Sequence, residues 1–109
     1  MPNTKLLYNK KIRTVWYGRR HKDYYCLNDV VKALTNIKDA KNYLKQMRQF
    51  DDKLGKKWWR FVIPLEMDTA GGRQKVMCTD TEGLLFIIEN MRSSDKTVLF
   101  KRWLKRRMN

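Results

Sequence analysis

The sequence predicts an α+β fold with two β-hairpins packed with about four helices in a single compact domain. Three observations support this prediction. Short β-branched and aromatic runs alternate with amphipathic stretches, turn-forming residues separate the paired runs, and hydrophobic residues make up 42% of the chain. A chain of 109 residues is long enough to bury roughly two-thirds of its surface on folding. We therefore expect one domain across residues 1–109.

The first hairpin is predicted from two runs rich in β-branched and aromatic residues, Lys11–Tyr17 and Tyr24–Leu27. The turn between them, Gly18–Lys22, is basic and carries Arg19 and Arg20 at its tip. Because the tip of a hairpin lies away from its paired strands, these two arginines are expected to be accessible to a partner.

Two helices are predicted to follow the first hairpin. Asn28 is expected to cap a short helix that ends near Asn36. A second helix should run from about Asp39 to Phe50, because apolar residues recur there at helical spacing. These residues are Tyr43, Leu44, Met47 and Phe50. Cations recur on another face of the same helix, namely Lys41, Lys45 and Arg48. Such a helix can pack on a core and face an anion, although a solvated cationic face is the ordinary alternative.

The second hairpin is predicted to start with an alternating strand, Trp58–Met67. Its packed side should hold Trp59, Phe61, Ile63 and Leu65. Trp58 could then be an exposed platform for base stacking or part of a second core layer. Pro64 cannot donate to a ladder, so the strand should lie at a sheet edge or contain a bulge. The turn Asp68–Gly72, whose two glycines can take positive φ, leads into the partner strand Arg73–Thr79.

A fourth segment, from Thr79 to about Met91, has the sequence of a buried helix. Thr79 and Glu82 have the spacing of a capping box. Apolar residues then cover most of the circumference: Leu84, Leu85, Phe86, Ile87, Ile88 and Met91. Gly83 is unfavourable by about 1 kcal/mol relative to alanine within a helix. We therefore expect that it permits close packing.

The last predicted helix is Asp95–Met108, with Ser93 or Ser94 as its cap. Its packing residues are expected to be Val98, Leu99, Trp103 and Leu104. The remainder of its surface is crowded by Lys101, Arg102, Lys105, Arg106 and Arg107. Cations near a helix C-terminus suit the macrodipole, but five are more than the dipole requires.

The net charge of the chain is +14 and is unevenly distributed. Residues 1–60 carry sixteen lysines and arginines against five acids, and residues 96–109 carry six against none. Self-repulsion of this size opposes folding, so a polyanionic partner is expected, and nucleic acid is the first candidate. The predicted DNA contacts are Arg19, Arg20, Lys41, Lys45, Arg48, Lys56, Lys57, Arg73, Lys75, Lys101, Lys105 and Arg106. We place Lys56 and Lys57 in a turn before the paired tryptophans, and expect Arg48 or Arg73 to read bases if any residue does.

Several other classes of function are not indicated. Cys26 and Cys78 are too few to cross-link a fold and are expected to be buried free thiols. His21 is the only histidine and the carboxylates are scattered, so we expect no metal site, no cofactor and no enzymatic activity. No stretch approaches the ~20 apolar residues of a membrane span, which predicts a cytoplasmic protein without membrane contact.

Four segments that follow the first hairpin resemble a known family. They are Asn28–Leu34, Gly72–Val76, Thr81–Leu84 and Phe100–Leu104. Together, in this order, they resemble the Bro-N family, the N-terminal domain of BRO proteins and phage antirepressors. Within the family, the chain is most similar to the bacterial DNA-damage-inducible protein D branch, judged by Val15–Tyr17, by Asp29–Val31 within the first of these segments, and by Lys38–Ala40.

The resemblance implies an α+β DNA-binding domain of viruses, phages and bacteria. Relatives usually continue into a variable C-terminal domain, which would lie beyond Asn109. The function expected is phosphate-backbone binding in phage or bacterial regulation, with double-stranded DNA favoured as the partner. An antirepressor-type regulator that binds a repressor or a host protein is the alternative, and a homodimer is left open.

Overall fold

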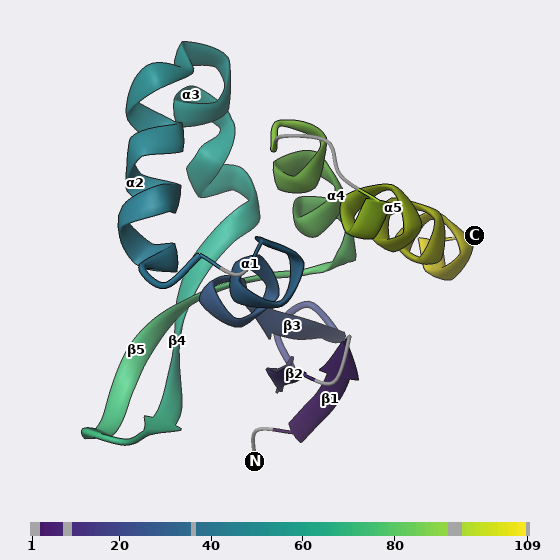
Figure 1. Cartoon of the computed structure of the whole chain (residues 1–109). Helices are drawn as coiled ribbons and strands as arrows, with labels where there is room; N and C mark the ends of the chain where they lie inside the picture. The colour runs from purple at the N-terminus through teal and green to yellow at the C-terminus, as the bar shows by residue number, and fades with distance from the viewer. Residues whose placement is uncertain (1–2, 8–9, 36, 92–94, 109) are drawn as a thin grey trace.

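The computed structural model describes residues 3–7, 10–35, 37–91 and 95–108 (Figure 1). These residues form an α+β fold, as predicted. The strands are β1 Asn3–Leu7, β2 Lys10–Tyr17, β3 Lys22–Cys26, β4 Val62–Thr69 and β5 Gly72–Thr79. The helices are α1 Leu27–Thr35, α2 Ala40–Phe50, α3 Asp52–Phe61, α4 Thr81–Glu89 and α5 Asp95–Met108. The described part of the chain thus holds five helices where about four were expected.

All five described strands belong to one antiparallel sheet with the order β1-β2-β3-β5-β4. Both predicted hairpins are present as β2–β3 and β4–β5, and β1 is an additional strand that the sequence did not indicate. The hairpins join through only two residue pairs, Tyr25 with Thr79 and Cys26 with Cys78. Strand β4 lies at the sheet edge, as Pro64 requires, because a proline has no N–H to donate to a second neighbour.

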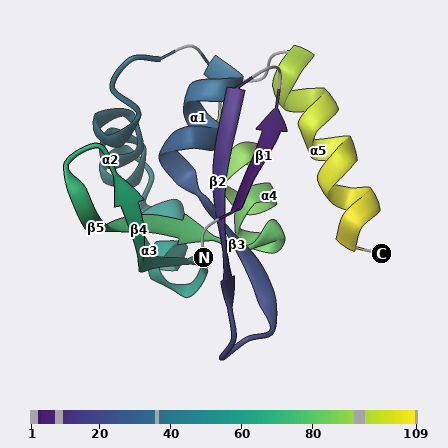
Figure 2. The ribbon, with the colours of Figure 1, turned by 90° about the horizontal axis from the view of Figure 1, so that it is seen from below.

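The helices cover one face of the sheet and form the main core with it. The views in Figures 1 and 2 place α2 at one end of the molecule and α5 at the other, with α1 and α4 between them. Residues of this core include Leu27, Val30, Leu44, Leu54, Trp58, Leu84, Ile88 and Leu104. A smaller cluster contains Tyr24, Cys26, Met67 and Cys78. Since successive strand residues point to opposite faces, Tyr24 and Cys26 lie on the other side of β3 from Tyr25, which belongs to the main core.

Helix α2 confirms the sequence prediction, whereas α3 replaces part of the predicted strand. The caps of the two helices are Asp39, which accepts from Asn42 N at 3.1 Å, and Asp51, which accepts from Leu54 N at 3.1 Å. Phe50 was expected in the core but is 87% exposed, because α2 ends there and the chain turns into α3.

The structure reverses the expected burial of Trp59. Trp58 is 1% exposed and Trp59 is 57% exposed. Strand alternation predicted a core position for Trp59, but both residues lie in α3. Helical spacing puts Trp58 on the same face as buried Leu54, four residues earlier, and turns Trp59 away from that face. Lys56 and Lys57 are consequently helical and exposed, and are not in a turn.

The boundaries of α1 and α4 differ from the predicted caps. Helix α1 begins at Leu27, so Asn28 lies in its first turn, and Asn36 is outside the described residues. The cap of α4 is Asp80, whose side chain accepts from Gly83 N at 2.9 Å. Thr79 is the last residue of β5, where its Oγ1 donates to the carbonyl oxygen of Phe61 at 2.7 Å, so the cap lies one residue later than predicted.

The end of α4 and the β4–β5 turn differ slightly from the prediction, whereas the bounds of α5 do not. Helix α4 ends at Glu89, two residues short of Met91, although Met91 is buried as expected. In the β4–β5 turn only Gly72 has a positive φ, 104°. The bounds of α5 agree with the prediction, and its expected caps at 93 and 94 lie outside the described residues.

The packed face of α5 differs from the predicted face. The buried residues are Thr97, Phe100 and Leu104, which recur at i, i+3 and i+7. Of the four residues expected to pack, only Leu104 is buried, whereas Val98, Leu99 and Trp103 are exposed. Trp103 stacks instead on Phe100, with ring centroids 5.5 Å apart. An apolar strip of α5 is therefore left on the surface.

The close approach of α4 to the end of β5 predicts that Gly83→Ala is destabilising. A Cβ atom at Gly83 would overlap Thr79 Oγ1 and lie 3.0 Å from Phe61 Cβ. Overpacking of a core costs about 1–3 kcal/mol, and the intrinsic gain of alanine over glycine in a helix is about 1 kcal/mol. We expect the free energy of unfolding to fall by up to about 2 kcal/mol in urea unfolding followed by circular dichroism.

Gly18→Ala is the matched control for this substitution. The nearest heavy atom to its added Cβ would be Trp16 Nε1 at 4.0 Å, which is ordinary contact. We expect this variant to differ from the wild type by less than about 0.5 kcal/mol. A Gly83→Ala protein as stable as Gly18→Ala would contradict the close packing of α4.

Candidate nucleic-acid interface

A groove of about 520 Å³ lies between α2 and the β4–β5 hairpin. Figure 1 shows the free end of this hairpin extending past α2 on the left of the molecule. The polar residues that line the groove are Arg13, Asn28, Lys41, Arg48, Thr69, Gln74 and Lys75. Apolar contacts come from Leu44, Trp58, Val76 and Met77. The lining therefore contains four cationic side chains and no acid.

Three of the predicted DNA contacts converge in this groove. Lys41 and Arg48 come from α2, and Lys75 comes from β5. Lys41 and Lys75 are exposed, and no acid in the described part of the chain forms an ion pair with either of them. Lys45 is also exposed on α2 but does not line the groove. Lys41 and Lys75 are thus sequence-distant cations of the groove whose charge no carboxylate of the described residues neutralises.

Arg48 is held by two tryptophans of α3. Its Cζ lies 5.0 Å from the centre of the Trp58 ring and 5.7 Å from that of Trp59. A guanidinium group at this distance from an aromatic ring is attracted by the electron density of the ring. Trp58 also contributes a buried Nε1–H that has no acceptor among the described residues. The two indole rings therefore hold one cation, Arg48, at this wall of the groove.

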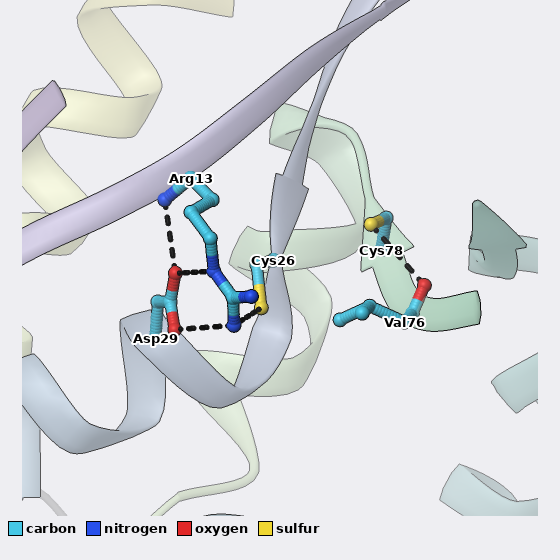
Figure 3. Close-up of polar contacts among 5 residues, drawn as sticks. All are labelled: Arg13, Cys26, Asp29, Val76 and Cys78. Atoms are coloured by element: carbon cyan, nitrogen blue, oxygen red, sulfur yellow. Dashed lines mark hydrogen bonds and ion pairs between the residues drawn. The ribbon is translucent and has the colours of Figure 1, made fainter. Parts of the chain in front are cut away.

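Arg13 in β2 was not among the predicted contacts, and its position depends on Asp29 in α1 (Figure 3). Asp29 Oδ2 accepts from the backbone N of Arg13 at 2.9 Å and from its Nε at 2.8 Å. Asp29 Oδ1 accepts from Arg13 Nη2 at 3.0 Å. The side-chain hydrogen bond to Asp29 raises the pKa of Arg13 further above its ordinary value. This bidentate pair holds β2 against α1 and fixes one cation of the groove.

The two cysteines lie opposite each other on β3 and β5, near the same arginine (Figure 3). Both are free and buried, which confirms the sequence prediction. Cys26 Sγ accepts from Arg13 Nη2 at 3.3 Å, and Cys78 Sγ donates to the carbonyl oxygen of Val76 at 3.3 Å. Burial raises the pKa of Cys26, and it raises the pKa of Cys78 to about 12. Both groups are therefore protonated thiols near neutral pH.

Arg73 does not join the groove, contrary to the sequence prediction. Its Nε lies 3.2 Å from Glu66 Oε2 and its Nη1 lies 3.3 Å from Asp68 Oδ1. The hydrogen bond to the side chain of Glu66, followed by that to Asp68, raises the pKa of Arg73. Strand pairing sets Asp68 directly opposite Arg73, so a cross-strand ion pair forms on the exposed hairpin. Its charge is balanced locally.

The remaining predicted contacts lie elsewhere. Arg19 and Arg20 are exposed at the β2–β3 turn, where Arg20 Nη1 donates to Tyr24 Oη at 3.1 Å. Lys101, Lys105 and Arg106 belong to α5, at the end of the molecule opposite α2 (Figures 1 and 2). Lys56 and Lys57 are on α3 but do not line the groove. The cations therefore form separate surfaces, and the groove is a concave one.

The described residues contain no cluster of three or more side chains suited to hold a metal ion. Within the same residues, no helix has the length and apolar character needed to cross a membrane. No family model matches the chain, and the searches of curated proteins and of solved structures found no match.

The geometry at Arg13 predicts a specific cost for Asp29→Asn. The amide group can still accept one hydrogen bond, but its NH₂ would face the donors of the guanidinium group. We expect the free energy of unfolding to fall by about 1–3 kcal/mol, measured by urea unfolding. Asp39→Asn is the matched control, since it removes the same charge at a helix cap where both residue types serve equally well. Equal stability of the two variants would argue against a structural role for the pair.

The buried thiols predict slow alkylation in the folded protein. The thiolate is the reactive form, and the pKa of Cys78 is about 12 in the folded state against about 8.5 for an exposed cysteine. The contribution of the Cys78 thiol to the free energy of unfolding is therefore fully present below the pKa of an exposed cysteine. It is lost as the pH rises from that value toward the pKa of Cys78 in the folded protein. We expect iodoacetamide to modify both cysteines in urea and neither in buffer at neutral pH, as measured by mass spectrometry. Equal rates in the two solutions would contradict this protection.

Proposed function

We propose that this chain is a DNA-binding domain of the Bro-N type, which holds the phosphate backbone in the groove between α2 and the β4–β5 hairpin. The observation that supports this proposal is the convergence of Lys41, Arg48 and Lys75 on a groove whose lining contains no acid. The proposal includes no catalytic step and no cofactor. Its setting would be regulation in a bacterial or phage-infected cell, as the resemblance implies.

The charge of the groove suits a polyanion in particular. Lysine and arginine side chains that neutralise phosphates release condensed counterions, which provides a salt-dependent driving force. Most contacts of this kind position a protein on the backbone without reading sequence. Arg48 is the groove cation whose planar fork could engage a guanine edge, and the amides of Asn28 and Gln74 could engage other base edges. Affinity would therefore come from the backbone, with base contacts limited to a few side chains.

An antirepressor-type interaction with a protein is the second candidate. It is favoured by the exposed apolar strip of α5, formed by Val98, Leu99 and Trp103 next to the cations of the same helix. Apolar surface beside charges is what a protein interface would use. Its test is co-purification with a co-expressed phage repressor. Loss of that complex in Leu99→Ser but not in Lys41→Ala would support this function.

DNA binding is tested with a salt series on labelled DNA, comparing the wild type with Lys41→Ala/Lys75→Ala. Each lost phosphate contact should reduce the slope of log affinity against log salt by about 0.9. We expect the double variant to bind more weakly at low salt and to have a slope shallower by up to about 1.8. Fluorescence anisotropy measures both quantities.

The matched control is Lys101→Ala/Lys105→Ala, which removes the same charge from α5. We expect it to retain most of the wild-type affinity and slope, because α5 lies away from the groove (Figure 2). If both double variants lose affinity equally, binding follows overall charge and not the groove. A salt-insensitive affinity would also overturn the proposal.

A further inference from the structure

We propose that the groove and Trp59 together bind an unpaired nucleotide of a DNA strand. Its phosphate would lie against Lys41, Arg48 and Lys75, and its base would stack on the indole of Trp59. This inference rests on the proposed DNA-binding function and adds to it a preference between strand states. The sequence favoured duplex DNA as the partner, and the exposed position of Trp59 changes that expectation.

The first observation is the exposure of Trp59 next to a cation of the groove. Trp59 is 57% exposed, whereas its neighbour Trp58 is 1% exposed and belongs to the core. A single exposed aromatic residue is ordinary on a protein surface. This one differs because Arg48, which lines the groove, lies with its Cζ 5.7 Å from the centre of the Trp59 ring. The flat apolar ring and the phosphate-binding cation are therefore neighbours.

That proximity matches the construction of a nucleotide, in which one sugar separates the phosphate from the base. A phosphate held by Arg48 would leave its base within reach of the neighbouring indole. Stacking on an aromatic side chain contributes to binding for every base, because each base has a π-face. Arginine is also suited to both contacts, since its weakly hydrated planar group pairs with phosphate and stacks on rings.

The second observation is the polarity of the groove wall. Besides its four cations, the lining offers the amides of Asn28 and Gln74. The NH₂ groups of these amides are hydrogen-bond donors, and phosphate oxygens and base carbonyls are acceptors that suit them. Trp58 Nε1–H is buried with the core side chain and is not counted among these donors.

A duplex would use only part of this site. Its phosphates could contact the lysines, but its base faces are covered by neighbouring base pairs and cannot stack on Trp59. The indole therefore distinguishes strand states, whereas Lys41 and Lys75 do not. A single strand, or a duplex with an extruded base, is the ligand that satisfies both the groove and the exposed ring.

The test compares Trp59→Leu with Trp16→Leu for binding to a short oligothymidylate and to a blunt duplex of equal length. Trp16 is the matched control because it is 56% exposed and its ring lies against His21, which is not a groove residue, whereas the Trp59 ring lies beside Arg48. Stacking of one base predicts that Trp59→Leu weakens single-strand binding by about 5- to 100-fold. Duplex binding and the salt slope should stay unchanged. Trp59→Phe should restore part of the single-strand affinity, and circular dichroism checks that each variant is folded.

Two outcomes overturn this inference while the proposed function survives. One is single-strand binding by Trp59→Leu equal to that of the wild type, with both still dependent on Lys41 and Lys75. The other is an equal loss of single-strand and duplex affinity in Trp59→Leu, because stacking acts only on unpaired bases. If the wild type binds neither form of DNA through Lys41 and Lys75, the proposed function fails, and this inference fails with it.

Discussion

The rest of the fold depends on the hydrogen bond that Thr79 Oγ1 donates to the carbonyl oxygen of Phe61 at 2.7 Å. This bond joins the end of β5 to the end of α3. Thr79 is fully buried and pairs with Tyr25 in β3 and with Val62 in β4. The missing side chain of Gly83 lets α4 approach the same residue. Three strands and the ends of two helices therefore meet at one threonine. Because β3 and β5 share only two residue pairs, this junction sets how the β4–β5 hairpin stands against α2, and hence the shape of the groove.

The distribution of acids explains why a chain of such high charge folds with a cationic groove. Most of the acids with described contacts cap a helix or pair with one of two arginines, Arg13 and Arg73. They are Asp29, Asp39, Asp51, Glu66, Asp68 and Asp80. Asp80 serves twice, since Lys22 Nζ also lies 3.3 Å from its Oδ2. Carboxylates are thus used at helix caps and at two arginines, of which Arg13 is half-buried and Arg73 is exposed. The repulsion that remains at the groove opposes folding and is relieved when an anion binds.

The spacing of apolar residues along the sequence predicted those elements in which buried residues recur at one regular interval, either helical or strand-like. Helix α2 was predicted almost to the residue, because its cap Asp39 and buried Leu44 suit a helix in any context. Helix α3 was missed because the residues after Lys57 alternate in polarity and read as a continuous strand. The four-residue spacing of Leu54 and Trp58 was the signal that could have indicated it. The error mattered, because the strand period predicted that Trp59 is buried and left Trp58 as the possible exposed platform, whereas the structure has the reverse.

The sequence could predict only those groove residues that lie on the same helix. Lys41 and Arg48 are seven residues apart in α2, a spacing that places them on one side of any helix. Lys75 lies near them because β5 pairs with β3, and Arg13 lies near them because it is bound to Asp29, sixteen residues away in sequence. Neither position follows from the spacing of neighbouring residues. These four cations also differ in how their charge is accommodated. Arg13 is paired with a carboxylate and Arg48 stacks on indoles, which leaves Lys41 and Lys75 with neither kind of contact among the described residues. Under the proposed function, a phosphate would therefore gain most at the two lysines, because its binding there would remove repulsion without breaking an existing interaction.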